Sequence, residues 1–167
     1  MFIELSSDDL ANLFEEAHQY LVNLDQQKGG WFANPVTDLI APGYSLIIKQ
    51  PMDLSTISSK LLDYSSLKEF SFDIELMFKN CMTFNEENSY IHQLAKYMLC
   101  KWFRKRKEVL SLILRTIHPS DNMDGDVNVN GQLDGTNVSL SRLFGRLFSL
   151  ELNTEMLKYS KINSKLY

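Results

Sequence analysis

Apolar positions recur along much of this chain at the three-to-four-residue spacing of helices. The first such segment begins after Ser6, a favourable N-cap because acidic residues follow it in the first turn. The segment should end at Gly29-Gly30, since glycine readily closes a helix. Its apolar stripe consists of Leu10, Leu13, Phe14, Ala17, Leu21 and Leu24.

Two further helices are predicted in the middle of the chain. Asp53 can cap the first of them, which should continue until residues 63–65 break it. Ser66 and Glu69 have the spacing of a capping box and should begin the second. The first carries Leu54, Ile57 and Leu61 on one face, and the second carries Leu67, Phe70, Ile74, Met77, Phe78 and Cys81.

A long last helix is predicted from about Tyr90 to Ile117, which is about 40 Å at the helical rise per residue. No strand alternation or hairpin signal occurs before it, so the predicted fold is an all-α bundle of four helices. The stripe of this helix consists of Ile91, Leu94, Ala95, Met98, Leu99, Trp102, Val109, Leu110 and Ile113.

A long proline-containing segment, residues 35–53, separates the first two helices and holds three of the four prolines. A connection of this length in a compact domain is usually functional or disordered. Its apolar residues argue against disorder. Ala41-Pro42-Gly43-Tyr44 fits a type II turn, with glycine at the position that needs a positive φ. We expect Leu46, Ile47 and Ile48 to anchor this loop to the bundle.

A second irregular segment, residues 83–90, lies between the third and fourth helices and therefore at one end of the bundle. The proline segment is long enough to reach that same end. A pocket between the two loops would have apolar walls and a few polar groups, of which Asn85 and Tyr44 are foremost. Taken alone, Asn85 is more typical of a helix C-cap and Tyr44 of a core tyrosine.

The composition suits a globular protein, with 44% hydrophobic residues in 167. A net charge of −4 makes a general nucleic-acid binder improbable. Cys81 and Cys100 lack metal-ligand spacing and are interpreted as buried free thiols of a reducing compartment. The N-terminus lacks the pattern of a signal peptide, and no apolar run is long enough to span a membrane.

A basic run at residues 101–107 lies on the predicted last helix. Such a run is most often a solvated face, and otherwise serves a weak contact to DNA or nuclear import. The residues that could make this contact are Lys101, Arg104, Lys105, Arg106 and Lys107.

The end of the chain differs in composition. Residues 119–138 are rich in Asp, Asn and Gly and form a predicted linker, and residues 139–167 form a predicted amphipathic helical tail of unknown role. Residues 126–137 approach a calcium loop but place Asn137 where a bidentate Glu is needed, so no metal is expected. No nucleophile elbow, phosphate loop or zinc-protease motif occurs, so neither a cofactor nor an enzyme is expected.

Several short motifs make residues 6–117 similar to a bromodomain, the module that reads acetylated lysine. They occur in family-like order and are Pro35-Val36, Pro42-Gly43-Tyr44, Ile47-Ile48-Lys49, Pro51-Met52-Asp53-Leu54 with Thr56-Ile57, and Asn80 through Asn85. The run at residues 35–49 further resembles the subfamily of bromodomain-containing proteins 7 and 9, subunits of SWI/SNF-type chromatin remodellers. The resemblance implies a left-handed four-helix bundle for residues 5–118.

The resemblance also implies roles for individual residues. Asn85 would donate a hydrogen bond to the acetyl oxygen, and Tyr44 would reach that oxygen through a water. The remaining pocket residues would be Val36, Ile40, Ile91, Phe32, Trp31 and Phe84, with Glu86, Glu87 and Asn34 at the rim. Three positions depart from the subfamily, which has tyrosine at Ile91, an aromatic residue at Asn34 and histidine at Gln50.

The resulting hypothesis is a nuclear acetyl-lysine reader that binds acetylated histone tails within a chromatin-remodelling complex. The alternative is a helical scaffold with a degenerate pocket, which would dock partners through the apolar helix at residues 139–151. A third reading, an enzyme that acts on acetylated lysine, has no motif to support it.

Overall fold

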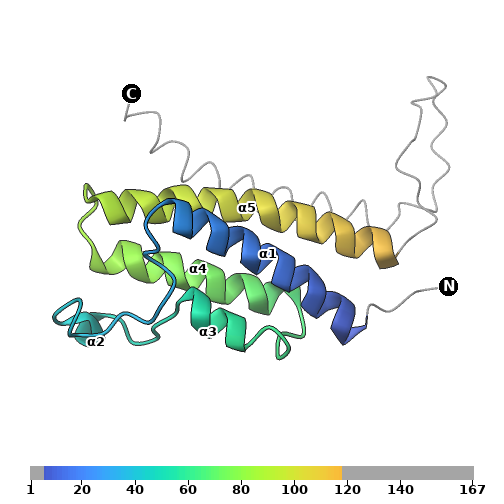
Figure 1. The fold of residues 1–167 in the computed structure, drawn as a ribbon, viewed down its shortest axis with the longest axis horizontal. Coiled ribbons are helices and arrows are strands. Elements are labelled where there is room, and N and C mark those ends of the chain that lie inside the picture. Colours follow the sequence, from blue (N-terminus) through green and yellow to red (C-terminus); the bar gives the residue numbers. More distant parts are fainter. Residues whose placement is uncertain (1–5, 118–167) are drawn as a thin grey trace, which may run out of the picture. The chain divides into compact units, whose positions relative to one another are not determined.

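The computed structural model describes residues 6–117, and the bundle considered below is the compact unit Glu4–Ile113. The described residues contain five α-helices and no strand. The helices are α1 (Ser7–Gln27), α2 (Tyr44–Ile47), α3 (Leu54–Ser59), α4 (Leu67–Phe84) and α5 (Tyr90–Ile117). In Figure 1, α1, α4 and α5 lie alongside one another, and α3 packs beside α1 and α4. The predicted all-α bundle is therefore confirmed.

Each of the three predicted caps forms. Ser6 accepts the Asp9 N–H at 3.1 Å, Asp53 accepts the Thr56 N–H at 3.0 Å, and Ser66 accepts the Glu69 N–H at 3.3 Å. Only one of the two hydrogen bonds of the predicted capping box forms as expected. The Glu69 carboxylate accepts the backbone N–H of Ser65 at 2.9 Å, one residue before the N-cap.

Large aromatic side chains fill the centre of the bundle. Phe14 of α1 stacks on Phe70 of α4 with ring centroids 4.6 Å apart, and Phe70 meets Trp102 of α5 edge to face at 5.5 Å. Three helices therefore meet at a single aromatic residue. The predicted stripes are confirmed, since their central members are buried: Phe14, Ala17, Leu21, Phe70, Ile74, Met77, Phe78, Leu94, Ala95, Met98, Leu99 and Trp102.

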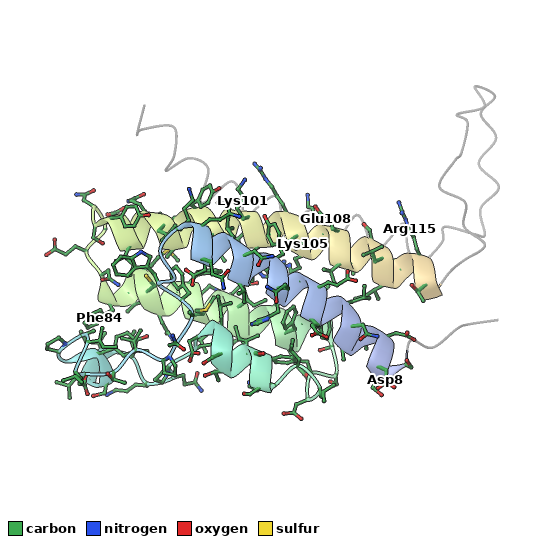
Figure 2. All side chains as sticks on the ribbon, in the orientation of Figure 1. Asp8, Phe84, Lys101, Lys105, Glu108 and Arg115 are labelled. Atoms are coloured by element: carbon green, nitrogen blue, oxygen red, sulfur yellow. The ribbon has the colours of Figure 1, made fainter. Side chains whose placement is uncertain are left out.

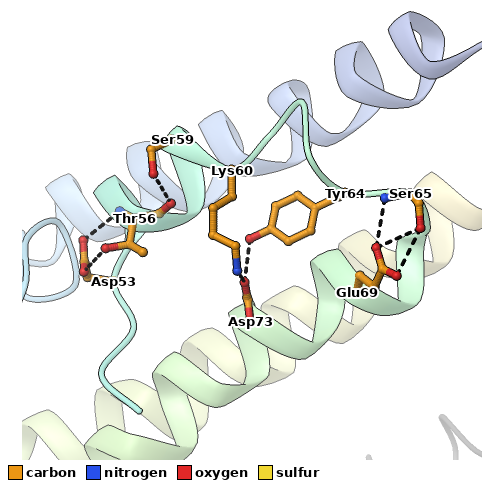
Figure 3. A network of polar contacts seen from close by, with 8 residues as sticks. All are labelled: Asp53, Thr56, Ser59, Lys60, Tyr64, Ser65, Glu69 and Asp73. Carbon is orange, nitrogen blue, oxygen red and sulfur yellow. Dashed lines mark hydrogen bonds and ion pairs between the residues drawn. The ribbon is translucent and has the colours of Figure 1, made fainter.

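Helix α3 is shorter than predicted, because it ends at Ser59 and leaves Leu61 outside the helix. Tyr64 explains the early end. Its ring is buried near Phe14 and Phe70, and its hydroxyl donates to Asp73 Oδ2 at 2.7 Å. The Lys60 ammonium pairs with the same oxygen, so the turn after α3 is tied to α4 (Figure 3).

The proline segment contains the one element that the apolar pattern did not predict, the single-turn helix α2. The predicted type II turn precedes it, with Gly43 at φ +82° and the Tyr44 N–H donating to the Ala41 carbonyl at 3.0 Å. The prediction that Leu46, Ile47 and Ile48 all anchor the loop is wrong. Only Ile48 is buried, whereas Leu46 and Ile47 are 77% and 53% exposed.

The reason lies in helical spacing. Residues four apart share one face of a helix, so a single turn that buries Tyr44 also buries Ile48 and directs Leu46 and Ile47 outward. Polar contacts complete the anchoring. The Asn80 side chain donates to the Gln50 carbonyl at 2.7 Å, and the His18 ring lies 2.8 Å from the Leu54 carbonyl oxygen.

The predicted linker at residues 119–138 and the predicted tail at residues 139–167, with the calcium-like segment, lie outside the described residues. Among the helices that the structure describes, none is both long and apolar enough to cross a bilayer.

Candidate functional site

The two irregular segments meet at one end of the bundle, as the sequence predicted. The Tyr44 ring at the start of α2 packs edge to face on Phe84 at the end of α4, with centroids 5.1 Å apart. Figure 1 shows α2 and the α4–α5 connection at the same end, and Figure 2 shows Phe84 beside α2. Phe84 is the immediate neighbour of Asn85, so the structure brings Tyr44 and Asn85 to the same end of the bundle.

Asn85 is half-buried and closes α4 as its C-cap. Its backbone N–H and its side-chain Nδ2 both donate to the Cys81 carbonyl, at 3.0 and 2.9 Å. The Nδ2 atom carries two hydrogens, and its other neighbour is the weakly accepting Cys81 sulfur at 3.6 Å. Capping therefore uses one hydrogen and leaves a second for a ligand.

Tyr44, a predicted pocket residue, is buried in the core. Burial raises the pKa of its phenol, so the hydroxyl is protonated and able to donate at neutral pH. Among the residues that the structure describes, no side chain or backbone group hydrogen-bonds to this hydroxyl. The ring that carries this donor is positioned by its contact with Phe84.

Trp31 and Phe32, predicted together, have different environments. Phe32 is buried, and its ring meets Phe78 of α4 edge to face at 5.1 Å. Trp31 is 50% exposed and approaches Tyr90, the first residue of α5, at 6.5 Å. In the predicted site, Phe32 would therefore belong to the inner wall and Trp31 would form an outer shelf.

The remaining predicted wall residues differ in exposure. Val36 and Ile91 are half-buried, whereas Ile40 is 75% exposed. The Ile91 carbonyl accepts the Cys81 thiol at 3.5 Å, which ties the start of α5 to the end of α4. Burial raises the pKa of the Cys81 thiol to about 11, so this cysteine stays protonated and suited to such a bond.

Two buried polar residues of α5 hold the second loop, and sequence reasoning missed both. The His92 ring lies 3.0 Å, through Nδ1, from the Asn85 carbonyl oxygen, and the Lys96 ammonium lies 3.4 Å from the Glu87 carboxylate. Their i, i+4 spacing on an otherwise apolar face was the available signal. Ser89, which accepts the His92 N–H, caps the helix.

The rim residues Glu86, Glu87 and Asn34 are exposed. Asp38, a further acid of the proline segment, is engaged instead as a local cap. It accepts the Ser45 N–H at 3.0 Å and the Ser45 hydroxyl, and these bonds lower the pKa of its carboxyl. The acidic charge available at the rim is therefore that of Glu86 and, in part, Glu87.

The basic run is less available than predicted. Arg106 pairs with Glu75 of α4 at 2.7 Å, with both side chains largely buried, and Lys105 pairs with Glu108 at 3.0 Å. Lys101 and Lys105 follow one side of α5 with Glu108 (Figure 2). Lys101, Arg104 and Lys107 remain outside these pairs, so DNA contact through all five residues receives no support.

The described residues thus form a helical bundle in which two loops meet at one end. The chain belongs to the bromodomain family, because the Bromodomain family model matches residues 4–97, more than half of its length. Bromodomains are acetyl-lysine reader modules of chromatin proteins.

The relatives found by comparison agree. Bromodomain-containing protein 9 of Homo sapiens is 39% identical over 112 residues, 66% of this chain and 18% of that protein. The Mus musculus protein of that name is 42% identical over 103 residues, 60% of this chain and 17% of that protein. Bromodomain adjacent to zinc finger domain protein 2B of Homo sapiens is 42% identical over 89 residues, 49% of this chain and 4% of that protein. The chain thus spans less than a fifth of these relatives.

Proposed function

We propose that the pocket between the two loops binds acetyl-lysine in histone tails, and that the chain serves as a module of a chromatin-remodelling subunit in the nucleus. The single observation that carries this proposal is the second amide hydrogen of Asn85, beside the buried Tyr44–Phe84 pair. Asn85 would donate to the acetyl oxygen, and Tyr44 would reach it through a water.

The surrounding residues suit the neutral, methyl-tipped side chain of acetyl-lysine. The walls would be formed by Val36, Ile40, Ile91, Phe32, Trp31 and Phe84, and the exposed rim by Glu86, Glu87 and Asn34. The charge on Glu86 and Glu87 favours the basic residues that flank a modified lysine in a histone tail.

The energetics predict strong discrimination with weak affinity. Burying the ammonium of unmodified lysine in an apolar pocket costs several kcal/mol. Acetylation removes that cost, while the amide hydrogen bond contributes about 1 kcal/mol and the methyl about 0.8 kcal/mol. Ordering a flexible tail offsets much of this gain, so we expect a Kd of roughly ten micromolar to one millimolar for a single site.

The test is calorimetry with matched histone-tail peptides that differ only in acetylation. Acetylated peptides should bind and unmodified ones should not, and equal affinity for both would contradict the proposal. Asn85→Ala should abolish the difference. Because this variant also removes a capping bond, its thermal unfolding must be compared with that of wild type.

Asn88→Ala provides a matched control, since Asn88 is an exposed asparagine of the same loop. It should bind acetylated peptides as wild type does. Retained binding in Asn85→Ala would show that the pocket assignment is wrong. Mass spectrometry of an acetylated peptide after incubation should show no turnover, and conversion would favour an enzyme instead.

A further inference from the structure

Asp25 is a buried carboxylate at the end of α1, on no wall of the proposed pocket. Only 1% of its surface is exposed, although it lies two residues before the last residue of the helix, Gln27. Burial raises the pKa of its carboxyl, and backbone hydrogen bonds from Phe32 and Trp31 partly oppose that rise. Burying a carboxylate is unfavourable unless the group is well paired, so the buried position of Asp25 requires a structural or functional explanation.

Three backbone hydrogen bonds converge on this residue. The Asp25 carbonyl accepts the N–H groups of Lys28 and Gly30, both at 2.9 Å. Together with the Gly29 N–H, which donates to Gln26, the Gly30 bond forms a Schellman motif that ends α1. The Asp25 side chain then reaches further along the chain, where Oδ2 accepts the Phe32 N–H at 3.1 Å.

Phe32 connects the end of α1 to both α3 and α4. Its carbonyl accepts the Leu54 N–H at 2.9 Å, which connects it to the start of α3, and its ring packs on Phe78. Trp31 immediately precedes it and is held on its outer side only by the edge of Tyr90 among the ring contacts of the described residues. The direction in which the Trp31 shelf points therefore depends on the Phe32 peptide.

We infer that Asp25 is a positioning residue of the acetyl-lysine site, which fixes the Trp31-Phe32 shelf by accepting the Phe32 N–H. This role rests on the proposed function of the pocket. Asp25 touches no ligand itself, and it acts through the two aromatic residues that do.

A residue that merely ends α1 would behave differently. The helix-ending bonds use the backbone carbonyl of Asp25, which any residue supplies. The side chain acts only on the shelf, through the Phe32 N–H that Oδ2 accepts and the neighbouring Trp31 N–H, and Oδ1 has no hydrogen-bond partner within the described part of the chain. A substitution at this position therefore tests the shelf rather than the helix end.

Two variants of the full chain separate these roles. Asp25→Ala removes the acceptor, and Asp25→Asn keeps an oxygen for the Phe32 N–H while removing the charge. Gln27→Ala is the control, because Gln27 is exposed in the same last turn. Asp25→Ala should weaken binding of an acetylated histone peptide about fivefold, the equivalent of one ordinary hydrogen bond. Asp25→Asn and Gln27→Ala should bind as wild type does.

Tryptophan fluorescence gives a readout that needs no ligand. Trp31 is half-exposed and Trp102, the other tryptophan, is fully buried, so acrylamide quenching reports Trp31. Quenching should rise in Asp25→Ala, because the shelf leaves Tyr90, and should stay at the wild-type value in Asp25→Asn.

Four outcomes are decisive. Weak binding and raised quenching in Asp25→Ala, both restored in Asp25→Asn, support the positioning role. Wild-type binding in both variants overturns it, and so does weakened binding without any change in quenching. If wild type binds no acetylated peptide, the proposed function fails, and the quenching comparison still decides whether Asp25 positions the shelf.

Discussion

Asn85 closes α4 and is also the proposed donor to acetyl-lysine. Its amide closes α4 on the Cys81 carbonyl and keeps a second hydrogen directed elsewhere. The C-cap and ligand-donor readings of this residue are therefore compatible. The ring of His92 on its backbone carbonyl further restrains it, so the proposed donor is placed before any ligand arrives.

Asp25 allows another prediction at the scale of a single residue, which concerns how the free energy of unfolding depends on pH. Its folded-state pKa is raised above the ordinary value near 3.8, mainly by desolvation. Below that value the residue is protonated in both states and imposes no penalty. As the pH rises through the folded pKa, the buried group must ionise, so stability is lost. Asp25→Asn does not titrate, so its free energy of unfolding should exceed that of wild type at pH 7.

Urea unfolding between pH 4 and 7 measures this difference. The advantage of Asp25→Asn should shrink as the pH falls toward 4, and Gln27→Ala should show no such trend relative to wild type. A constant difference across the range would mean that the charge of Asp25 is not the cause.

The end of α1 allows a prediction at the scale of an element. Gly29 has φ +112°, and a β-carbon there would lie 2.8 Å from Trp31 Nε1, whereas Gly30 at φ +71° has open space around it. Both Gly→Ala changes should cost about 1 kcal/mol for the left-handed backbone. Only Gly29→Ala should also displace Trp31. Thermal unfolding measures the first effect and acrylamide quenching the second, with Gly30→Ala as the control.

The junction of α3 and α4 offers a second test. Asp73 Oδ2 accepts from the buried Tyr64 hydroxyl and pairs with Lys60, whose side chain is 40% exposed. The exposed pair should contribute little and the buried bond more. Asp73→Ala should therefore lower the free energy of unfolding by about 1–3 kcal/mol, and Tyr64→Phe by about 1 kcal/mol.

A double-mutant cycle in urea connects the two changes. The combined variant should lose less than the sum of the single losses, because both remove the same bond. Additive losses would show that the tyrosine and the aspartate act separately.

The helices were predictable wherever spacing and caps agreed. The bounds of α5 and the caps at Ser6 and Asp53 follow from local sequence, because each depends on residues within one or two turns. Helix α2 and the early end of α3 depend on distant partners, above all Asp73 and Phe84. Such contacts leave no local pattern, which is why the loop anchoring was predicted wrongly.

Sequence likewise predicted some residues of the candidate site and missed others. The joint location of Tyr44 and Asn85 followed from the order of helices and the length of the proline segment. The supporting residues Asp25, His92 and Lys96 could not be assigned, since a polar residue within an apolar stripe reads as an interruption until its partner is known.

At the scale of the whole molecule, ion pairs neutralise part of the basic run on α5. Arg106 of α5 and Glu75 of α4 form a largely buried pair, and Lys79 joins Glu75 from the surface. Such pairing turns part of a basic run into an interhelical contact. A stretch of like charge in the sequence is therefore a poor guide to the charge that a partner meets.

The last prediction concerns how much of the chain the proposed site needs. Every predicted site residue lies between Trp31 and Ile91, within the compact unit Glu4–Ile113, whose core is built by its own helices. A chain ending at residue 118 should therefore fold cooperatively and bind acetylated histone peptide within about twofold of the full chain, about 0.4 kcal/mol. Circular dichroism establishes folding and calorimetry the affinity. If the truncated chain folds but loses peptide binding, the tail contributes to the site. If binding persists while capture of a partner complex requires residues 139–167, recognition of acetyl-lysine and docking are separate functions of the two parts.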